Sequence, residues 1–311
     1  MSDNKKVTFT YFISALLFLT LAVVGTFVDT KVSDALYMPL NLPFMIISVI
    51  GQYVFFGSVV FFGGVIFSQV IKIREYSNAK KACVLIICGI IVLIGAYFGA
   101  RTIPHSEGFG AYDVISNMPH FPVLLASLVI TMPPFFICGF RAKITCDKHL
   151  IGKLLRLIVF LIFLSVVVQI LKGFFERPRY RTTLAFDDVS YVPWYKAVGD
   201  AKAIAAKFGT EKNSFESFPS AHSWMAAASL YIIPAFSWVS GKLKGKEFQL
   251  TVAGLVIALL VMLSRIVLGA HYLTDVSIGA FAGTVMSFIQ LMIESKINHK
   301  IKSTDKERLT V

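Results

Sequence analysis

The stretch SRIVLGAHYLTD, at Ser264–Asp275, carries residues that suit chemistry on a phosphoryl group. His271 and Asp275 are four residues apart, so a helical turn would place them on one face. A carboxylate bonded to one ring nitrogen fixes the tautomer and leaves the other nitrogen free to attack. Arg265 adds a fixed positive charge. The stretch therefore predicts a nucleophilic imidazole beside a cation.

A second stretch, SFPSAHSW at Ser217–Trp224, directly precedes an apolar run. Ser220 is a suitable N-cap for a helix that begins near Ala221, and the free N–H groups of such a helix end attract anions. His222 could protonate the leaving oxygen of a phosphate ester. This stretch therefore predicts a phosphate contact and a general acid.

A third stretch, LKGFFERPRYR, supplies Lys172 and Arg179. Guanidinium groups bind phosphate oxygens in a bidentate manner, and lysine adds a point charge. Two histidines around such cations suit phosphoryl transfer through a phosphohistidine. Because the cations can stabilise the developing charge themselves, the sequence predicts no metal and no other cofactor. A metal site at His105 and His120, with Glu107 and Asp113, is a weaker alternative to a solvated loop.

These three stretches resemble the motifs of the type 2 phosphatidic acid phosphatase superfamily, which also includes vanadium haloperoxidases. The motifs are Lys-x6-Arg-Pro, Pro-Ser-Gly-His and Ser-Arg-x5-His-x3-Asp. The third is complete here, and the second has Ala221 in place of glycine. The first runs from Lys172 to Arg179, with Tyr180 where proline is expected. Arg177 is an alternative to Arg179, although its spacing from Lys172 is two residues short.

The resemblance implies specific roles and metal-independent catalysis. His271 would be the nucleophile, Asp275 its orienting partner and His222 the general acid. The residues implied to hold the phosphate are Lys172, Arg179, Ser220, Ala221 and Arg265. The substrates that it implies are undecaprenyl pyrophosphate, phosphatidylglycerol phosphate or phosphatidic acid. A lipid phosphotransferase that uses the same site, and an anion transporter, remain open as alternatives.

The composition indicates a membrane protein. Of the 311 residues, 56% are hydrophobic and 15% are charged, and the mean hydropathy is +0.72. A soluble domain is typically less apolar and carries about 25% charged residues. The formal net charge of +12 could suggest nucleic acid. Since the charges lie between apolar runs, membrane topology explains them, and we expect membrane lipids and a lipid phosphate as partners rather than nucleic acid.

We expect an all-α, polytopic membrane helix bundle with about eight transmembrane helices and a six-helix phosphatase-type core. The expected spans are Val7–Phe27, Gln52–Val70, Ala82–Ala100, Pro122–Phe140, Leu154–Leu171, His222–Val239, Gln249–Leu268 and Leu273–Ile293. The first resembles a signal peptide, but its apolar run is long and lacks a clear cleavage site, so we interpret it as a retained span. The segment Leu36–Ile50, which contains two prolines, is expected to be re-entrant or interfacial.

Charge sets the expected orientation and domains. Lysine and arginine are concentrated in the loops on the side of the termini, so both termini should be cytoplasmic and the site should face outward. Tyr195–Gly209 predicts a helix, either on the bilayer surface or in a solvated loop. We divide the chain into N-terminal helices at 1–150, with two spans additional to the usual core, a catalytic core at 151–295 and a basic tail at 296–311.

Overall fold

The computed structural model describes residues 3–106, 108–144, 147–196 and 200–309. In these ranges the protein consists of helices and connecting turns, with no strand. The long helices are α1 (Asp3–Leu36), α2 (Leu42–Lys72), α3 (Asn78–Arg101), α5 (His120–Phe140), α6 (Lys148–Phe175), α11 (Glu247–Val267) and α12 (Leu273–Leu309). The shorter ones are η1 (Phe109–Ala111), α4 (Asp113–Ser116), α7 (Tyr180–Ala185), α8 (Ala201–Lys207), η2 (Lys212–Phe215), α9 (Ala221–Ala227), α10 (Ser229–Ala235), η3 (Phe236–Trp238) and η4 (Gly241–Leu243).

The expected all-α polytopic bundle is confirmed. Seven helices of the described chain are long and apolar enough to cross a membrane. The remaining expected span, His222–Val239, is not one long helix, because α9, α10 and η3 follow one another end to end across this stretch. Pro234 lies inside α10. A proline lacks the backbone N–H that a continuous helix requires, which explains the change from α10 to η3 but not the earlier break at Ala228.

The expectation for Leu36–Ile50 is wrong. Helix α1 continues to Leu36, and α2 already begins at Leu42, so most of the segment belongs to a membrane-crossing helix. Asn41 is the N-cap of α2 and its side chain accepts from the amide of Phe44. Pro43 falls at the start of the helix, where a proline costs no hydrogen bond. The prolines therefore mark the start of a helix rather than a break in a re-entrant segment.

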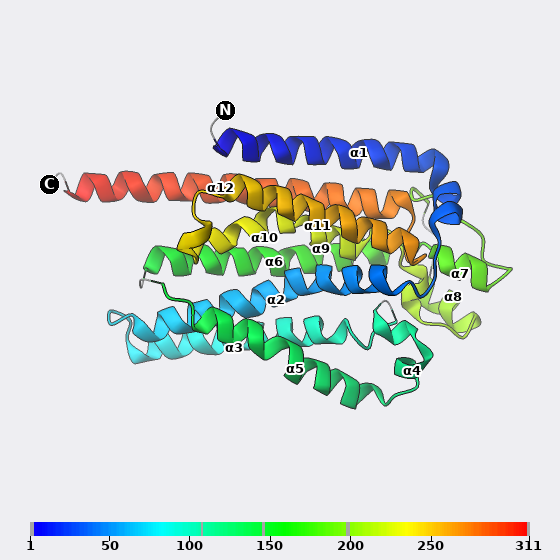
Figure 1. Ribbon diagram of the computed structural model, residues 1–311, viewed down its shortest axis with the longest axis horizontal. Helices are drawn as coiled ribbons and strands as arrows, with labels where there is room; N and C mark the ends of the chain where they lie inside the picture. The colour runs from blue at the N-terminus through cyan, green and yellow to red at the C-terminus, as the bar shows by residue number, and fades with distance from the viewer. Residues whose placement is uncertain (1–2, 107, 145–146, 197–199, 310–311) are drawn as a thin grey trace.

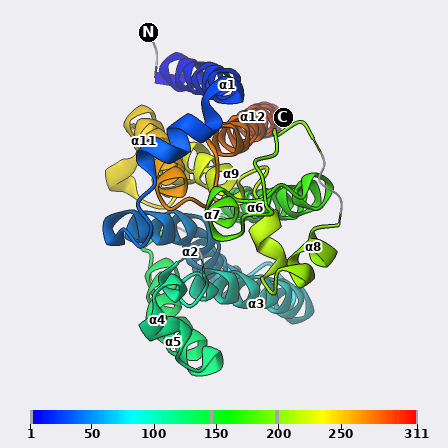
Figure 2. The same cartoon turned by 90° about the vertical axis from the view of Figure 1, so that its right-hand side faces the viewer.

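The helices are arranged around α2, which is the most buried of the seven. Seen from the end of the bundle, α1 lies at one edge and α5 at the other (Figure 2). Helix α1 packs on α12 and α11, whereas α2 packs on α6, α9 and α11. Helices α3 and α5 pack mainly on α2 and on each other. The division of the chain at residue 150 stays a prediction, and the structure shows that α1 and α2 contact the C-terminal helices directly.

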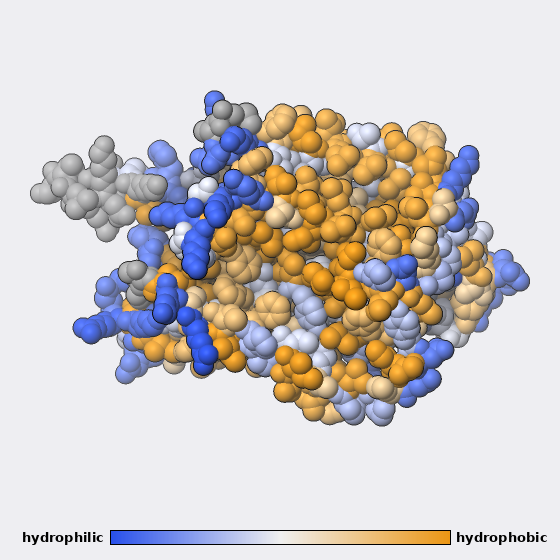
Figure 3. Space-filling model, viewed as in Figure 1, coloured by the Kyte–Doolittle hydropathy of each residue, from blue (hydrophilic) through white to orange (hydrophobic). Residues whose placement is uncertain are grey.

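The outside of the bundle is apolar over a broad band (Figure 3). Large hydrophobic side chains on the long helices are strongly exposed, among them Phe27 at 80%, Ile130 at 70% and Leu93 at 69%. Hydrophilic residues gather at the two ends of the molecule (Figure 3). An exposed apolar belt of this extent is stable only against lipid. The protein is a multi-pass membrane protein.

Both termini lie at one end of the bundle, and α7 and α8 lie at the other (Figure 1). Helix α8 covers part of the expected Tyr195–Gly209 helix, while residues 197–199 lie outside the described chain. Its Ala201 and Ala205 are buried with Phe215 of η2 in a small separate core. This packing against other loop segments makes α8 part of a folded cap at that end of the bundle.

Candidate active site

Three segments that are far apart in the sequence meet at the end of the bundle opposite the termini (Figure 1). The amide of Ser217 donates to the carbonyl of Arg177 at 2.9 Å, which joins the second segment to the first. The amide of Ser220 donates to the carbonyl of Asp275 at 3.1 Å, which joins the second to the third. Arg177 Nη1 donates to Asp275 Oδ1 at 2.5 Å, which joins the first to the third. The three stretches therefore form one site.

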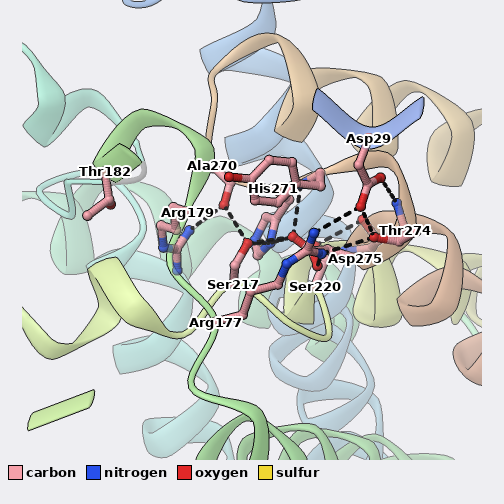
Figure 4. A network of polar contacts seen from close by, with 12 residues as sticks. Asp29, Arg177, Arg179, Thr182, Ser217, Ser220, Ala270, His271, Thr274 and Asp275 are labelled. Atoms are coloured by element: carbon pink, nitrogen blue, oxygen red, sulfur yellow. Dashed lines mark hydrogen bonds and ion pairs between the residues drawn. The ribbon is translucent and has the colours of Figure 1, made fainter. Parts of the chain in front are cut away.

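His271 and Asp275 are close, but not in the way that their spacing predicted. Helix α12 begins at Leu273, so His271 lies in the loop before it rather than on the same helical face. Its Nδ1 is 3.7 Å from Asp275 Oδ2. The hydroxyl of Ser217 donates to Asp275 Oδ2 at 2.5 Å and lies 3.4 Å from His271 Nδ1 (Figure 4). Ser217 therefore bridges the imidazole and the carboxylate.

The other ring nitrogen of His271 is left for a ligand. His271 is fully buried, and its Nε2 makes no hydrogen bond within the described part of the chain. Burial lowers the pKa of His271 to about 3, and the charges of Arg179 and Arg265 act in the same direction. A histidine whose pKa lies that low is neutral at pH 7, so one ring nitrogen carries a lone pair. This is the state that a nucleophilic imidazole requires.

Arg177 is enclosed among carboxylates and carbonyls on the Asp275 side. Besides its bond to Asp275, it donates from Nη2 to Asp29 Oδ2 at 2.9 Å and from Nε to the carbonyl of Val192 at 2.7 Å. Nη1 also donates to the hydroxyl of Thr274 at 3.0 Å. The side chain is fully buried. These bonds fix Arg177 as a structural partner of Asp275.

Arg179, only two residues later, lies on the other side of His271 (Figure 4). It donates from Nε to the carbonyl of Asn213 at 2.5 Å and from Nη1 to the carbonyl of Ala270 at 3.2 Å. Unlike Arg177, it lines a cavity. Of the two arginines left open by the sequence, this placement favours Arg179 for contact with a phosphate.

The cavity has a volume of about 780 Å³ and two chemically different parts. At one part, Lys172 from the last turn of α6, Arg179, Ala221 and His222 line it. The rest of its wall is built mainly from apolar side chains of α2, α3 and α6, among them Phe55, Phe56, Val59, Ile91, Ile94, Phe98, Leu161, Ile162, Val166 and Ile170. A charged head and a long apolar tail of one ligand would match these two parts.

Three further expected residues, Ser220, Arg265 and His271, are fully buried and are not among the residues that line this cavity, although Ser220 directly precedes Ala221 of its wall. Arg265 lies in the last turn of α11, and its Nη1 donates to Ser48 Oγ of α2 at 2.9 Å. Its carbonyl accepts from the amide of His271 at 3.2 Å. Helix α2 thus positions Arg265, and Arg265 in turn positions the histidine loop.

Ser220 is the N-cap of α9, as the sequence predicted, and its hydroxyl accepts from the amide of Ser223 at 3.4 Å. Helix α12 comes very close to it, because a Cβ at Gly279 would lie 2.6 Å from the Ser220 carbonyl oxygen. Only glycine permits this approach. Gly269 has a φ of +63°, which turns the chain sharply between α11 and the histidine. These two glycines allow the second and third segments to meet.

Sequence reasoning gave no role to Ser217 and Asp29, which both belong to this network. Ser217 stands in the quoted stretch SFPSAHSW, three residues before Ser220. Asp29 lies on α1 and is 2% exposed. The expected span ended at Phe27, so Asp29 gave no signal in the sequence; in the structure α1 continues to Leu36, and a buried carboxylate on such a helix marks a functional position. No group of three or more His, Cys, Asp or Glu side chains in the described ranges could hold a metal ion, and Glu107 of the alternative metal site lies outside those ranges.

Comparison with known proteins agrees with these motifs. A protein-family model, the PAP2 superfamily, matches residues 153–298. No curated protein and no solved structure shows significant similarity to the chain. The match begins within α6 and ends within α12, and it includes all three segments of the site. Its family supports a phosphatase-type hydrolase of lipid or related phosphoesters. Residues 153–298, close to half of the chain, match the PAP2 superfamily model, and this match supports the resemblance to the type 2 phosphatidic acid phosphatase superfamily.

Proposed function

We propose that this protein is an integral membrane phosphatase that hydrolyses a lipid phosphate or pyrophosphate through a phosphohistidine at His271. The observation that carries the proposal is the cavity, which joins a cationic part to an apolar wall of α2, α3 and α6. A soluble phosphate ester would need only the cationic part. Undecaprenyl pyrophosphate, phosphatidylglycerol phosphate and phosphatidic acid each combine a phosphate head with long apolar tails, so they are the candidate substrates.

In the first step, Nε2 of His271 attacks the phosphorus atom. The hydroxyl hydrogen of Ser217 is directed to Asp275 at 2.5 Å, so the Ser217 oxygen can accept from Nδ1–H of His271. This tautomer leaves the lone pair on Nε2. As the P–N bond forms, the P–O bond to the lipid breaks, and His222 protonates the leaving oxygen. Lys172, Arg179 and Arg265 stabilise the charge on the phosphoryl oxygens, with Ser220 and the Ala221 amide as further donors.

In the second step, water attacks the phosphohistidine. His222, now neutral, takes a proton from the water, and the P–N bond breaks to return the electron pair to Nε2. The products are the lipid alcohol, or the lipid monophosphate from a pyrophosphate, and inorganic phosphate. Protein groups perform each proton transfer, so the proposed mechanism uses no metal ion.

We also propose that the site faces away from the cytoplasm. The loops at the end of the termini carry many basic residues, among them Lys72, Arg74, Arg141, Lys143, Lys242 and Lys244. Cytoplasmic loops are enriched in lysine and arginine. The site lies at the opposite end (Figure 1), which would place it toward the outer leaflet. Protease accessibility of tags placed at the C-terminus and in loop 187–190 would test this orientation.

The direct test is a panel of lipid phosphates presented to the purified protein in detergent, with phosphate release as the readout. We expect release from at least one lipid phosphate or pyrophosphate, and slow release from a soluble aryl phosphate that lacks a tail. The His271→Ala variant is the control for contaminating phosphatases. Equal rates on the soluble and the lipid substrates would contradict the lipid assignment.

Adding an alcohol acceptor to the same assay distinguishes hydrolysis from the phosphotransferase alternative. If water is the acceptor, the ratio of inorganic phosphate to released lipid product stays at one as the acceptor concentration rises. A falling ratio with a new phosphorylated product would identify a phosphotransferase.

A further inference from the structure

Asp29 links the N-terminal helix α1 to the proposed catalytic pair, His271 and Asp275. It lies on α1, outside the part of the chain that matches the family model. Its Oδ2 accepts from Arg177 Nη2 at 2.9 Å, from the hydroxyl of Tyr191 at 3.3 Å and from the hydroxyl of Thr274. Its Oδ1 accepts from the amide of Thr274 at 2.8 Å. Four donors therefore converge on one buried carboxylate.

Asp29 acts on Asp275 along two routes. Thr274 lies in the first turn of α12, next to Asp275, so the bond to its amide fixes the helix end that carries Asp275. A carboxylate at a helix N-terminus also interacts favourably with the helix dipole. The second route is Arg177, which donates to Asp29 through Nη2 and to Asp275 through Nη1. One guanidinium thus holds both carboxylates in fixed positions.

Aromatic rings hold that guanidinium in place. The Cζ of Arg177 lies 4.2 Å from the ring centroid of Tyr272 and 5.1 Å from that of Tyr191. The Tyr272 amide donates to Asp275 Oδ2 at 2.8 Å. Arg177 therefore has little freedom to turn toward the cavity, and its charge serves Asp275 rather than a phosphate.

We propose that Asp29 and Arg177 are positioning residues, which hold Asp275 in the orientation from which Ser217 and His271 are aligned for attack. The proposal rests on the proposed phosphatase function and extends it to α1. Neither residue touches the phosphoryl group. Their loss lowers the rate of the chemical step and leaves substrate binding unchanged, because Arg179, which lies on the other side of His271 (Figure 4), lines the cavity together with Lys172.

The test compares Asp29→Asn with the wild-type protein in detergent, well below the thermal midpoints of both. Asparagine keeps the shape and removes the charge. We expect kcat to fall by about 10- to 100-fold, since bonds between charged groups are lost. KM and the inhibition constant of inorganic phosphate should stay within about twofold, because the groups that bind phosphate are intact. Rates are normalised to folded protein measured by size-exclusion chromatography.

The matched control is Asp34→Asn, the same change on the same helix. Asp34 is exposed, and its hydrogen-bond partner is the hydroxyl of Tyr180 at 2.6 Å rather than Arg177 or Thr274. Its kcat should equal that of the wild type. If Asp29→Asn also has the wild-type kcat, or if its phosphate affinity falls as far as its kcat, the positioning role is overturned.

A second variant covers the case in which Asp29→Asn does not fold. Tyr191→Phe removes only the hydroxyl that donates to Asp29 and keeps the ring beside Arg177. It should lower kcat several-fold with an unchanged KM, and a wild-type kcat would count against the proposal. If the wild-type protein itself releases no phosphate from any lipid phosphate, the proposed function fails instead, so the two failures are distinguishable.

Discussion

Two arginines that are two residues apart occupy contrasting regions of the site. Arg177 lies in a closed polar network, bonded to the carboxylates of Asp29 and Asp275. Arg179 bonds to backbone carbonyls and lines the cavity that contains Lys172 and His222. The first region contributes rigidity around Asp275, and the second offers positive charge to a ligand. Chain spacing alone does not predict which of two nearby cations has which role.

The contrast has a simple origin in the local backbone. Glu176 ends α6 in the left-handed conformation, with a φ of 43°, and the chain then runs extended to the start of α7 at Tyr180. Each arginine is fixed by a different backbone contact, because the carbonyl of Arg177 accepts from the amide of Ser217 whereas the amide of Arg179 donates to the carbonyl of Ser214, both at 2.9 Å. The charges of these arginines therefore serve different partners.

Removing each arginine in turn should separate the two regions most clearly. Arg179→Ala should lower the rate of phosphate release by about 100- to 1000-fold, since it removes a cation that stabilises the phosphoryl oxygens. Arg177→Ala leaves buried carboxylates without their partner and should lower the free energy of unfolding by about 3–5 kcal/mol. Thermal midpoints in detergent and rates per folded protein measure both effects.

The decisive comparison sets, for each variant, the fall in the rate of phosphate release against the fall in the thermal midpoint. Arg179→Ala should lose more rate at a smaller cost in thermal midpoint than Arg177→Ala. If Arg177→Ala had the larger effect on KM, and Arg179→Ala changed stability alone, the assignment of the two regions would be reversed.

Ser217→Ala should have the next largest effect, because Ser217 joins the closed network to His271. We expect kcat to fall by about 10- to 100-fold, since a hydrogen bond to a charged group is lost. Ser214→Ala, in the same connection but bonded to Thr210, is the control. Steady-state kinetics on one lipid substrate would reveal the effect, and equal kcat values for the two variants would remove Ser217 from the mechanism.

The apolar wall of the cavity should respond more weakly. Ile94 lines the cavity, so Ile94→Trp should narrow it. Ile90, one turn earlier on α3, does not line the cavity, so Ile90→Trp is the control. The two residues are similarly exposed, Ile94 at 52% and Ile90 at 54%. We expect Ile94→Trp to raise KM for a long-chain substrate several-fold and to leave a short-chain one unaffected. Measuring both substrates with both variants tests this, and a similar response from Ile90→Trp would mean that the tail binds elsewhere.

Chelation should have the smallest effect. Since the cavity cations supply the charge stabilisation in the proposed mechanism, an excess of EDTA should leave the rate of phosphate release unchanged. Loss of activity that magnesium restores would require a metal ion and a different mechanism.

Much of this architecture could be predicted from the sequence because its main signals are local. Apolar runs long enough to span a bilayer predicted seven of the helices, and Ser220 marked the start of α9. The segment 36–50 was mispredicted because prolines both break helices and begin them, and the difference depends on the cap at Asn41. The stretch 221–238 was recognised as an apolar span, but the interruptions between α9, α10 and η3 were not predicted.

The parts of the site that the sequence did not predict depend on contacts between residues that are distant in the chain. Asp29 reaches Thr274 across 245 positions of the chain, and no spacing rule connects the two. Ser217 was visible in its motif, but its bond to Asp275 requires the meeting of two segments. Residue type and spacing identified the groups suited to phosphoryl transfer, whereas the groups that position them became visible only in three dimensions.

The most direct test of the central claim is whether His271 carries the phosphoryl group during turnover. The protein is mixed rapidly with lipid substrate labelled in its terminal phosphate, quenched in alkali, which preserves phosphohistidine, and digested so that the labelled peptide can be sequenced. We expect label on His271, and neither label nor phosphate release in His271→Ala. Label on another residue, or phosphate release by His271→Ala at the wild-type rate, would contradict it.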